Sequence, residues 1–277
     1  MSNLLSGLED LGLGGLDDME VYGDVETKAK KPVKPEAEKQ EKTEDEYLFD
    51  KTYTCPVCNE DFKTSTVRTG KAKLIGTDSD LRPRYQGVDP LKYDAIVCPR
   101  CGYAALSRFF TTMTSAQSKL VMEQISRKFH ATIKTDGVFS YDDAILHHRL
   151  SLASAVVKRS KVSERAYICL KTAWLLRGKQ EECEKEAEKK ELFGQEQEFL
   201  KTAYEGFNEA TSKEDYPICG MDEMTMLCLL ADLARRIGKY DEAGRLISKI
   251  LTSRNASERI KNKAREIKEL TAAEMSK

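Results

Sequence analysis

Residues 227–251 read LCLLADLARRIGKYDEAGRLISKIL, and this stretch decides the fold class. Two apolar series at helical spacing are separated by a turn around Gly238. The first series is Leu227, Leu230 and Ala231, and the second is Ala243, Ile247 and Ile250. Small residues at a helix crossing allow two helices to approach closely. The stretch therefore predicts two helices packed side by side as a hairpin.

The spacing within this hairpin is that of a tetratricopeptide repeat. Gly238 and Tyr240 stand at its turn, and Ala243 stands where the paired helices of such a repeat touch. Weaker echoes occur at residues 139–144 and 166–174. One good repeat and two partial ones fall short of the roughly three that a regular solenoid needs. We therefore expect a compact tetratricopeptide-like stack of helical hairpins with a concave face.

Helical patterns fill the chain from residue 112 onward, and helix-capping signals divide them. The expected N-terminal caps are Thr114, Ser140, Ser163 and Asn255, and Gly178 is the expected C-terminal stop of the helix that Ser163 begins. In the helix after Thr114, apolar residues recur at Val121, Ile125 and Phe129. Ahead of residue 112, segments 47–55, 71–75 and 93–98 have the composition of short strands. The fold class predicted is mostly α, with seven helices and a small β zinc-ribbon-like module in front.

Two C-x-x-C pairs carry the strongest chemical signal: Cys55-Pro-Val-Cys58 and Cys98-Pro-Arg-Cys101. Two residues between cysteines let a tight turn aim both thiolates at one ion, and two such knuckles complete a zinc tetrahedron. Asn59 and Gly102 follow the knuckles, and both residue types tolerate the positive φ required there. We predict one structural Zn²⁺ held by Cys55, Cys58, Cys98 and Cys101. A closed site of this kind leaves no open position for catalysis.

The main alternative function for these four cysteines is that of a thiol redox sensor. A thioredoxin-like pair stands at the start of a helix in a βαβ setting, and neither pair has that context. Thiols that bind metal fit a reducing compartment, so a cytoplasmic location is expected.

The segment between the knuckles is long and basic. It contains 39 residues, more than the roughly 15–20 of a compact ribbon. Between Phe62 and Tyr85 the sequence has six cationic residues and only two acidic ones, Asp78 and Asp80. The cationic residues are Lys63, Arg68, Lys71, Lys73, Arg82 and Arg84. We expect a solvated hairpin that offsets the negative four-thiolate centre, and the alternative is binding to RNA or DNA.

The chain divides into four parts by composition. Residues 1–23 are acidic and leucine-rich, residues 24–46 form a disordered charged linker, residues 47–111 hold the zinc-ribbon-like module, and residues 112–277 hold the tetratricopeptide-like domain. Segment 1–23 is either an unstructured terminus or a docking motif that occupies a groove of the helical domain. It has no Lys or Arg before Lys28, so it lacks the positive start of a secretory signal.

Composition and motifs exclude several functions. Lys and Arg number 45 against 46 Asp and Glu, which argues against a globally basic nucleic-acid coat protein. No stretch reaches the roughly 18 apolar residues of a membrane span. Nucleophile–base pairs, phosphate-binding glycine loops and H-E-x-x-H helices are all missing from the sequence. The sequence therefore predicts a non-enzymatic protein.

The tandem order of CPVCNEDF, YDAIVCPRCGYAAL, AWLLRGK and RRIGKYDEA resembles a family of uncharacterised bacterial proteins, common in clostridia and other Firmicutes. Members pair an N-terminal module of two C-x-x-C motifs with C-terminal tetratricopeptide-like helices, and the likeness covers about residues 47–255. The resemblance implies a cytoplasmic protein whose four cysteines match the family's metal positions. It implies no activity.

These observations favour a non-enzymatic zinc-binding scaffold whose helical hairpins bind a protein partner. The first alternative is a nucleic-acid-binding zinc protein that uses the basic segment between the knuckles, and the second is the redox sensor.

Overall fold

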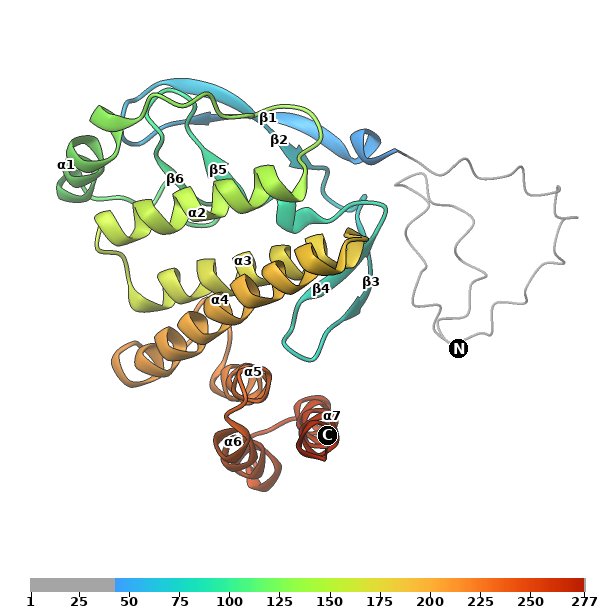
Figure 1. The fold of residues 1–277 in the computed structure, drawn as a ribbon. Helices are drawn as coiled ribbons and strands as arrows, with labels where there is room; N and C mark the ends of the chain where they lie inside the picture. The colour runs from blue at the N-terminus through green and yellow to red at the C-terminus, as the bar shows by residue number, and fades with distance from the viewer. Residues whose placement is uncertain (1–42, 277) are drawn as a thin grey trace, which may run out of the picture. The chain divides into compact units, whose positions relative to one another are not determined.

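The computed structural model describes residues 43–276, which belong to one compact unit (Figure 1). Segment 1–23 and nearly all of the expected linker lie outside the described residues. The described chain holds seven α-helices and six short strands, which confirms the mostly α fold with a small β module. None of the helices in this part of the chain is long and apolar enough to cross a membrane.

The six strands form three separate antiparallel hairpins. These are β1 (Leu48–Thr54) with β2 (Asp61–Val67), β3 (Lys73–Thr77) with β4 (Pro83–Gln86), and β5 (Ala95–Val97) with β6 (Ala104–Leu106). The sequence pattern located the first strand of each hairpin. It did not single out the returning strands: β4 is short and begins with proline, and β6 consists of two alanines and a leucine. β2 does contain aromatic and β-branched residues, among them Phe62, Thr64 and Val67.

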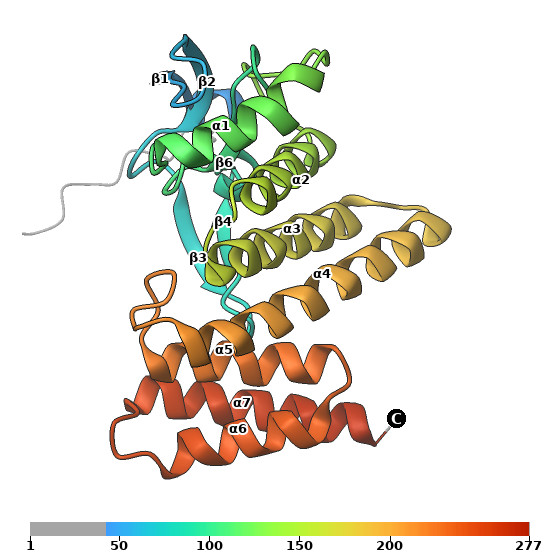
Figure 2. The ribbon, with the colours of Figure 1, turned by 90° about the vertical axis from the view of Figure 1, so that its left-hand side faces the viewer.

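Seven helices follow in the order α1 (Ser115–Gln124), α2 (Tyr141–Val157), α3 (Val162–Glu182), α4 (Glu186–Lys213), α5 (Glu223–Arg236), α6 (Tyr240–Thr252) and α7 (Glu258–Met275). Figure 2 shows α2, α3 and α4 in succession, with α5, α6 and α7 grouped beyond α4. The main core lies between α3, α4 and α5, where Trp174, Leu200, Phe207 and Leu229 are buried. Burial of each such side chain contributes about 1.5–3 kcal/mol before entropy is counted.

The α5–α6 hairpin confirms the prediction of two packed helices for residues 227–251. All six packing positions named from the sequence are buried: Leu227, Leu230, Ala231, Ala243, Ile247 and Ile250. Gly238 makes the turn with a φ of +78°. Helix α7 then covers the open side of this hairpin with Ile260, Ala264 and Ile267.

Two of the expected helix starts are confirmed. Thr114 accepts a hydrogen bond from the Gln117 N–H and Ser140 accepts one from the Asp143 N–H, each within a reciprocal capping box. Helix α1 is shorter than expected, however, and ends at Gln124. Phe129 lies beyond it with its ring against Gly102, so contact with the second knuckle replaces the last helical turn.

Three other capping expectations were wrong. Ser163 is inside α3, where its N–H and hydroxyl both donate to Glu214. Helix α3 runs through Gly178 to Glu182, because Gly178 makes room for a close-packed side chain instead of ending the helix. Ser257 caps α7 in place of Asn255, accepting a hydrogen bond from the Ile260 N–H.

The last β hairpin packs directly on the helices. Ala95 and Leu106 share a buried cluster with Ala155 of α2 and Ile168 of α3. The Ala104 N–H donates to the Ser154 hydroxyl oxygen at 3.1 Å. An apolar interface therefore joins β5–β6 to α2 and α3.

Candidate metal centre

The two knuckles come together from two different hairpins. Cys55 and Cys58 lie at the β1–β2 turn, and Cys98 and Cys101 lie at the β5–β6 turn. Their four Sγ atoms, termed here the cysteine cage, all lie within 4.8 Å of one another. Cys55, Cys98 and Cys101 are buried, and Cys58 is partly exposed. The structure thus brings together all four residues that the sequence singled out as metal ligands.

The backbone of each knuckle has the conformation that its sequence predicts. The Asn59 N–H donates to the Cys55 carbonyl at 2.9 Å, and the Gly102 N–H donates to the Cys98 carbonyl at 3.0 Å. Asn59 has a φ of +58° and Gly102 a φ of +72°, in the left-handed region that these residue types tolerate. These turns point both thiols of a pair toward the same point.

The size of the cage fits a tetrahedral metal ion. The Sγ atoms of Cys55 and Cys101 are 3.5 Å apart, and those of Cys58 and Cys98 are 3.7 Å apart. A Zn–S bond of about 2.3 Å in a tetrahedron places its sulfurs about 3.8 Å apart. A disulfide needs about 2.05 Å, and all four thiols are free.

The thiols influence one another's protonation. Hydrogen bonds from Cys101 and then Cys55 lower the pKa of Cys98. Hydrogen bonding to Cys101 and Cys98, together with burial, raises the pKa of Cys55. A divalent cation bound by these cysteines would displace their thiol protons, because thiolates are the metal-binding form.

Aromatic side chains close the cage on its inner side. The Tyr53 and Phe62 rings meet Phe110 edge to face at 5.6 and 5.9 Å. Tyr103 is fully buried and donates its hydroxyl to the Phe110 carbonyl at 3.0 Å. An apolar wall of this kind excludes water and is typical of a metal site that stabilises a fold.

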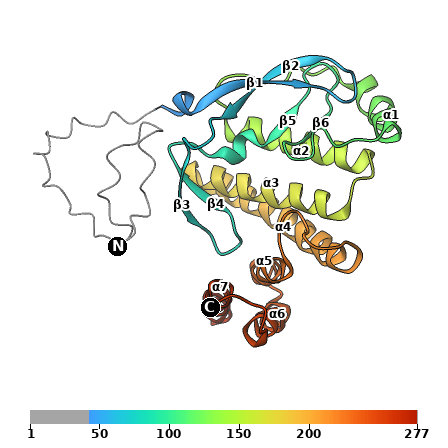
Figure 3. The ribbon, with the colours of Figure 1, turned by 180° about the vertical axis from the view of Figure 1, so that it is seen from behind.

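The segment between the knuckles folds into β3–β4, termed here the β-arm (residues 73–86), which extends beside α3 (Figure 3). The expectation of a solvated hairpin was wrong for its tip. Ser79 is 6% exposed, Asp80 is fully buried and Arg82 is 3% exposed. The tip of the β-arm packs among helix residues, so the tip is part of the helical core.

Asp80 is the centre of that contact. Its carboxylate accepts hydrogen bonds from the Trp174 indole at 3.0 Å and from the Arg177 guanidinium at 2.7 Å. Burial alone raises the pKa of a carboxyl group, but Arg177 and Arg236 outweigh it and hold the pKa of Asp80 at about 2. Asp80 therefore stays ionised in the protein interior.

A second buried carboxylate extends this network to α5. Asp232 accepts from the Ser79 hydroxyl at 2.9 Å and from Arg235 and Arg236 at 2.8 and 2.7 Å. Sequence reasoning missed this network. Partners more than 90 residues apart leave no local signal, although two acids amid six cations in the β-arm segment were a hint.

The network also changes the interpretation of the basic segment. Arg82 and Arg84 both donate to Glu181 of α3, at 3.1 and 2.7 Å, so two of the six cations serve the fold. The remaining four, Lys63, Arg68, Lys71 and Lys73, are exposed. Any electrostatic footprint on nucleic acid is correspondingly smaller than the sequence implied.

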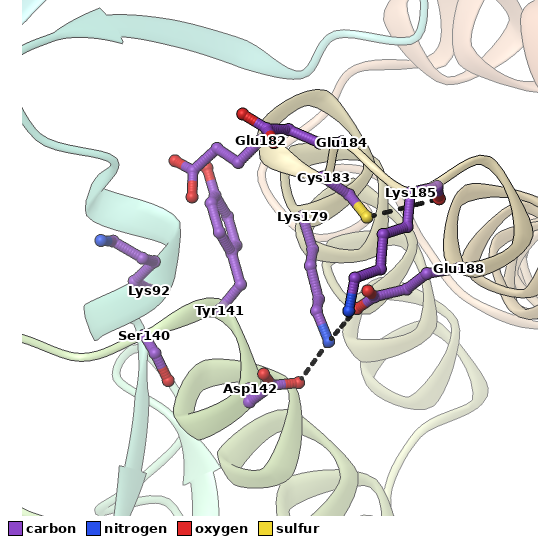
Figure 4. A pocket seen from close by; sticks show the side chains of 10 residues that line it. All are labelled: Lys92, Ser140, Tyr141, Asp142, Lys179, Glu182, Cys183, Glu184, Lys185 and Glu188. Atoms are coloured by element: carbon purple, nitrogen blue, oxygen red, sulfur yellow. Dashed lines mark hydrogen bonds and ion pairs between the residues drawn. The ribbon is translucent and has the colours of Figure 1, made fainter.

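A hollow of about 420 Å³ lies where α2 begins and α3 meets α4 (Figure 4). Its charged groups largely neutralise one another. Lys179 bridges Asp142 at 2.8 Å and Glu188 at 3.3 Å, and Lys92 pairs with Glu44 at 2.7 Å. The Cys183 thiol donates to the Lys185 carbonyl oxygen. A hydrogen bond from the same thiol lowers the pKa of Glu188, so Cys183 is held among the charged groups of the lining.

Fold and cage together define a tetratricopeptide-like helical protein with a four-cysteine module that could hold a metal. The model of a family described as an uncharacterised protein conserved in bacteria, DUF2225, matches residues 48–271. The chain belongs to this family. Searches of curated proteins and of solved structures found no match.

Proposed function

We propose that this protein is a non-enzymatic scaffold in which one structural Zn²⁺ fixes the front hairpins and the helices bind a partner protein. The single observation that carries the proposal is the closed cage of four cysteine sulfurs within 4.8 Å. All four ligand positions of a tetrahedral ion are supplied by the chain, which leaves none for substrate or water. Such an ion holds two hairpins together and takes no part in a reaction.

A groove between α2, α3 and α4 supports partner binding. It encloses about 330 Å³, and its apolar lining comes from Leu152, Val156, Ala166, Cys169 and Gly206. The Val156 side chain is 53% exposed, which is unusual for an apolar residue beside a groove. Grooves of this kind between helices accept the apolar face of an amphipathic helix.

The first experiment measures metal and partner in one preparation. Tagged full-length protein is captured from native lysate in nuclease-treated and untreated halves, and its zinc is quantified by mass spectrometry. We expect about one zinc per chain and a protein partner that survives nuclease. The Val156→Asp variant is expected to lose that partner, whereas Met275→Ser, a change at an exposed residue of α7, keeps it.

The same preparation tests the competing functions. Nucleic-acid binding is favoured by two cation–aromatic pairs at the β1–β2 hairpin. Lys51 lies 4.8 Å from the ring centre of half-buried Tyr53, and Arg68, just after β2, lies 5.8 Å from that of exposed Phe49. If nuclease treatment abolishes capture of the partner, the assigned function becomes nucleic-acid binding. A redox sensor instead predicts metal-free protein whose cysteines form disulfides on mild oxidation.

Two further proposals concern the cellular location of the protein and its relatives. Four metal-binding thiolates require a reducing compartment, so we assign the protein to the cytoplasm. The narrower relationship to proteins of clostridia and other Firmicutes, which the tandem motifs suggested, stays a prediction.

A further inference from the structure

Strand β3 presents an open edge. Within residues 43–276 it pairs with β4 alone, and Figure 3 shows β4 between β3 and α3. All five of its residues are exposed. Leu74 is 54% exposed and Ile75 is 62% exposed, so two large apolar side chains face water. The ladder to β4 shifts register between Leu74 and Gly76, which leaves Ile75 without a partner on β4. Natural proteins usually shield such an edge, because it recruits further strands.

The strand is held in place at both ends of the β-arm. At the tip, Asp80 is locked to Trp174 and Arg177. At the base, the Tyr47 ring packs against Gly87, and along β4 Arg84 binds Glu181. An edge that is already ordered loses little conformational entropy when a ligand pairs with it.

Positive charge flanks this edge at its beginning. Lys71 and Lys73 are exposed there, and residues 71–77 contain no acidic side chain. At the other end, Lys263 of α7 donates to the Thr77 carbonyl oxygen at 3.4 Å and pairs with Glu266 at 3.4 Å. A ligand that covers the strand therefore meets, at the end where β3 begins, lysines that are uncompensated within the described residues.

We propose that β3 binds an extended acidic segment of a partner protein, which adds to the β-arm as a further strand. Main-chain hydrogen bonds to the edge supply affinity, alternate apolar side chains cover Leu74 and Ile75, and carboxylates meet the flanking lysines. The chemistry favours a peptide over nucleic acid, because β3 offers no aromatic ring for a base. This surface is separate from the α2–α4 groove and goes beyond the proposed function, so either can fail alone.

The test uses full-length protein and a fluorescein-labelled peptide that alternates valine and glutamate over about nine residues, enough to span β3. A matched peptide carries lysine in place of glutamate. Fluorescence anisotropy is expected to show at least about tenfold tighter binding of the acidic peptide. Lys73→Glu is expected to weaken that binding about fivefold, as loss and reversal of one exposed ion pair implies. Ile75→Asp is expected to weaken it further, and Val156→Asp in the groove leaves it unchanged.

Amide hydrogen exchange places the peptide. Protection gained at residues 73–77 on binding supports strand addition, and equal binding of both peptides or protection gained only elsewhere overturns it. The amides of β3 could already be protected in the free monomer, with a photo-crosslinker at position 75 forming cross-links to residues 1–42. That result would show that a segment of the same chain occupies the edge. A dimer that dissociates in Ile75→Asp would assign it to a second copy. Capture of a labelled oligonucleotide instead of the acidic peptide would assign it to nucleic acid.

Discussion

Trp174 of α3 donates its indole N–H to the carboxylate of Asp80 at the tip of the β-arm, across 3.0 Å and 94 residues of sequence. Both residues are buried, Asp80 completely and Trp174 to 4% exposure. The contact joins the segment between the metal knuckles to the middle of the helical core. Because a buried charge is stable only with its partners, the β-arm and the helices depend on each other.

Removing the Asp80 carboxylate tests this dependence. Asp80→Ala removes the carboxylate shared by Trp174, Arg177 and Arg236, and leaves Arg177 with Glu196 and Arg236 with Asp232. We therefore expect the free energy of unfolding to fall by about 3 kcal/mol, the lower end for a broken buried ion pair. Urea denaturation of the full-length protein measures it. Asp50→Ala, at an exposed position on β1, is the control, and its effect is expected within about 0.5 kcal/mol. Equal losses in the two variants would show that the network contributes nothing specific.

Removing one cage ligand tests the metal centre. Cys98→Ser is expected to lose zinc and to unfold the β1–β2 and β5–β6 hairpins, because metal binding supplies their folding energy. Loosening should reach α2 near Ala155, which packs on β5–β6, while α5–α7 keep their protection. Metal analysis and hydrogen exchange measure the two effects.

The control for this variant is Cys183→Ser, a thiol outside the cage, which is expected to keep its zinc. Retention of zinc in Cys98→Ser contradicts the proposed ligand set. Loss of protection through α7 would show instead that the hairpins and all helices fold as one unit.

Two helical glycines form a matched pair. A Cβ on Gly178 of α3 would lie 2.5 Å from the Tyr141 ring, whereas one on Gly194 of α4 would meet nothing within 4 Å. We expect Gly194→Ala to stabilise the protein by about 0.5–1 kcal/mol, since alanine is the better helix former. Gly178→Ala should instead destabilise it by about 1–3 kcal/mol through overpacking. Thermal unfolding measures the change in stability of both variants. Changes of the same sign in the two variants would contradict this packing.

Buried His148 predicts a loss of stability in mild acid. Burial lowers the pKa of its ring from 6.5 to about 4, although the Asp94 carboxylate opposes this. The unfolded chain takes up the proton first as pH falls, so stability decreases between about pH 6.5 and 4, by up to about 3 kcal/mol. His147, whose pKa burial also lowers, acts in the same direction.

Urea midpoints measured from pH 7 to 4 check this slope. Protonation of the cage thiols releases metal in the same range, so His148→Leu serves as the reference in which only the imidazole is missing. The wild-type profile should be steeper than that of the variant by about one proton. Parallel profiles would count against a neutral buried His148.

Sequence patterns located the features whose physics is local. The knuckles at Cys55–Cys58 and Cys98–Cys101 follow from two-residue spacing and from residues that tolerate positive φ, and the structure has both turns. The capping boxes at Thr114 and Ser140 follow from side chains three residues apart. The helix end predicted at Gly178 was wrong, because this glycine allows close packing and does not terminate the helix.

The sequence by itself determined the fold class, the α5–α6 hairpin and the identity of the four clustered cysteines, because periodicity and short spacings encode each of them. Only the tertiary structure decided that the basic segment between the knuckles docks on the helices, that Arg82 and Arg84 pair with Glu181, and that β3 pairs with β4 alone among residues 43–276. Such pairings are fixed by the burial of charges from distant segments, which must find partners once water is excluded. No pattern within one segment carries that information.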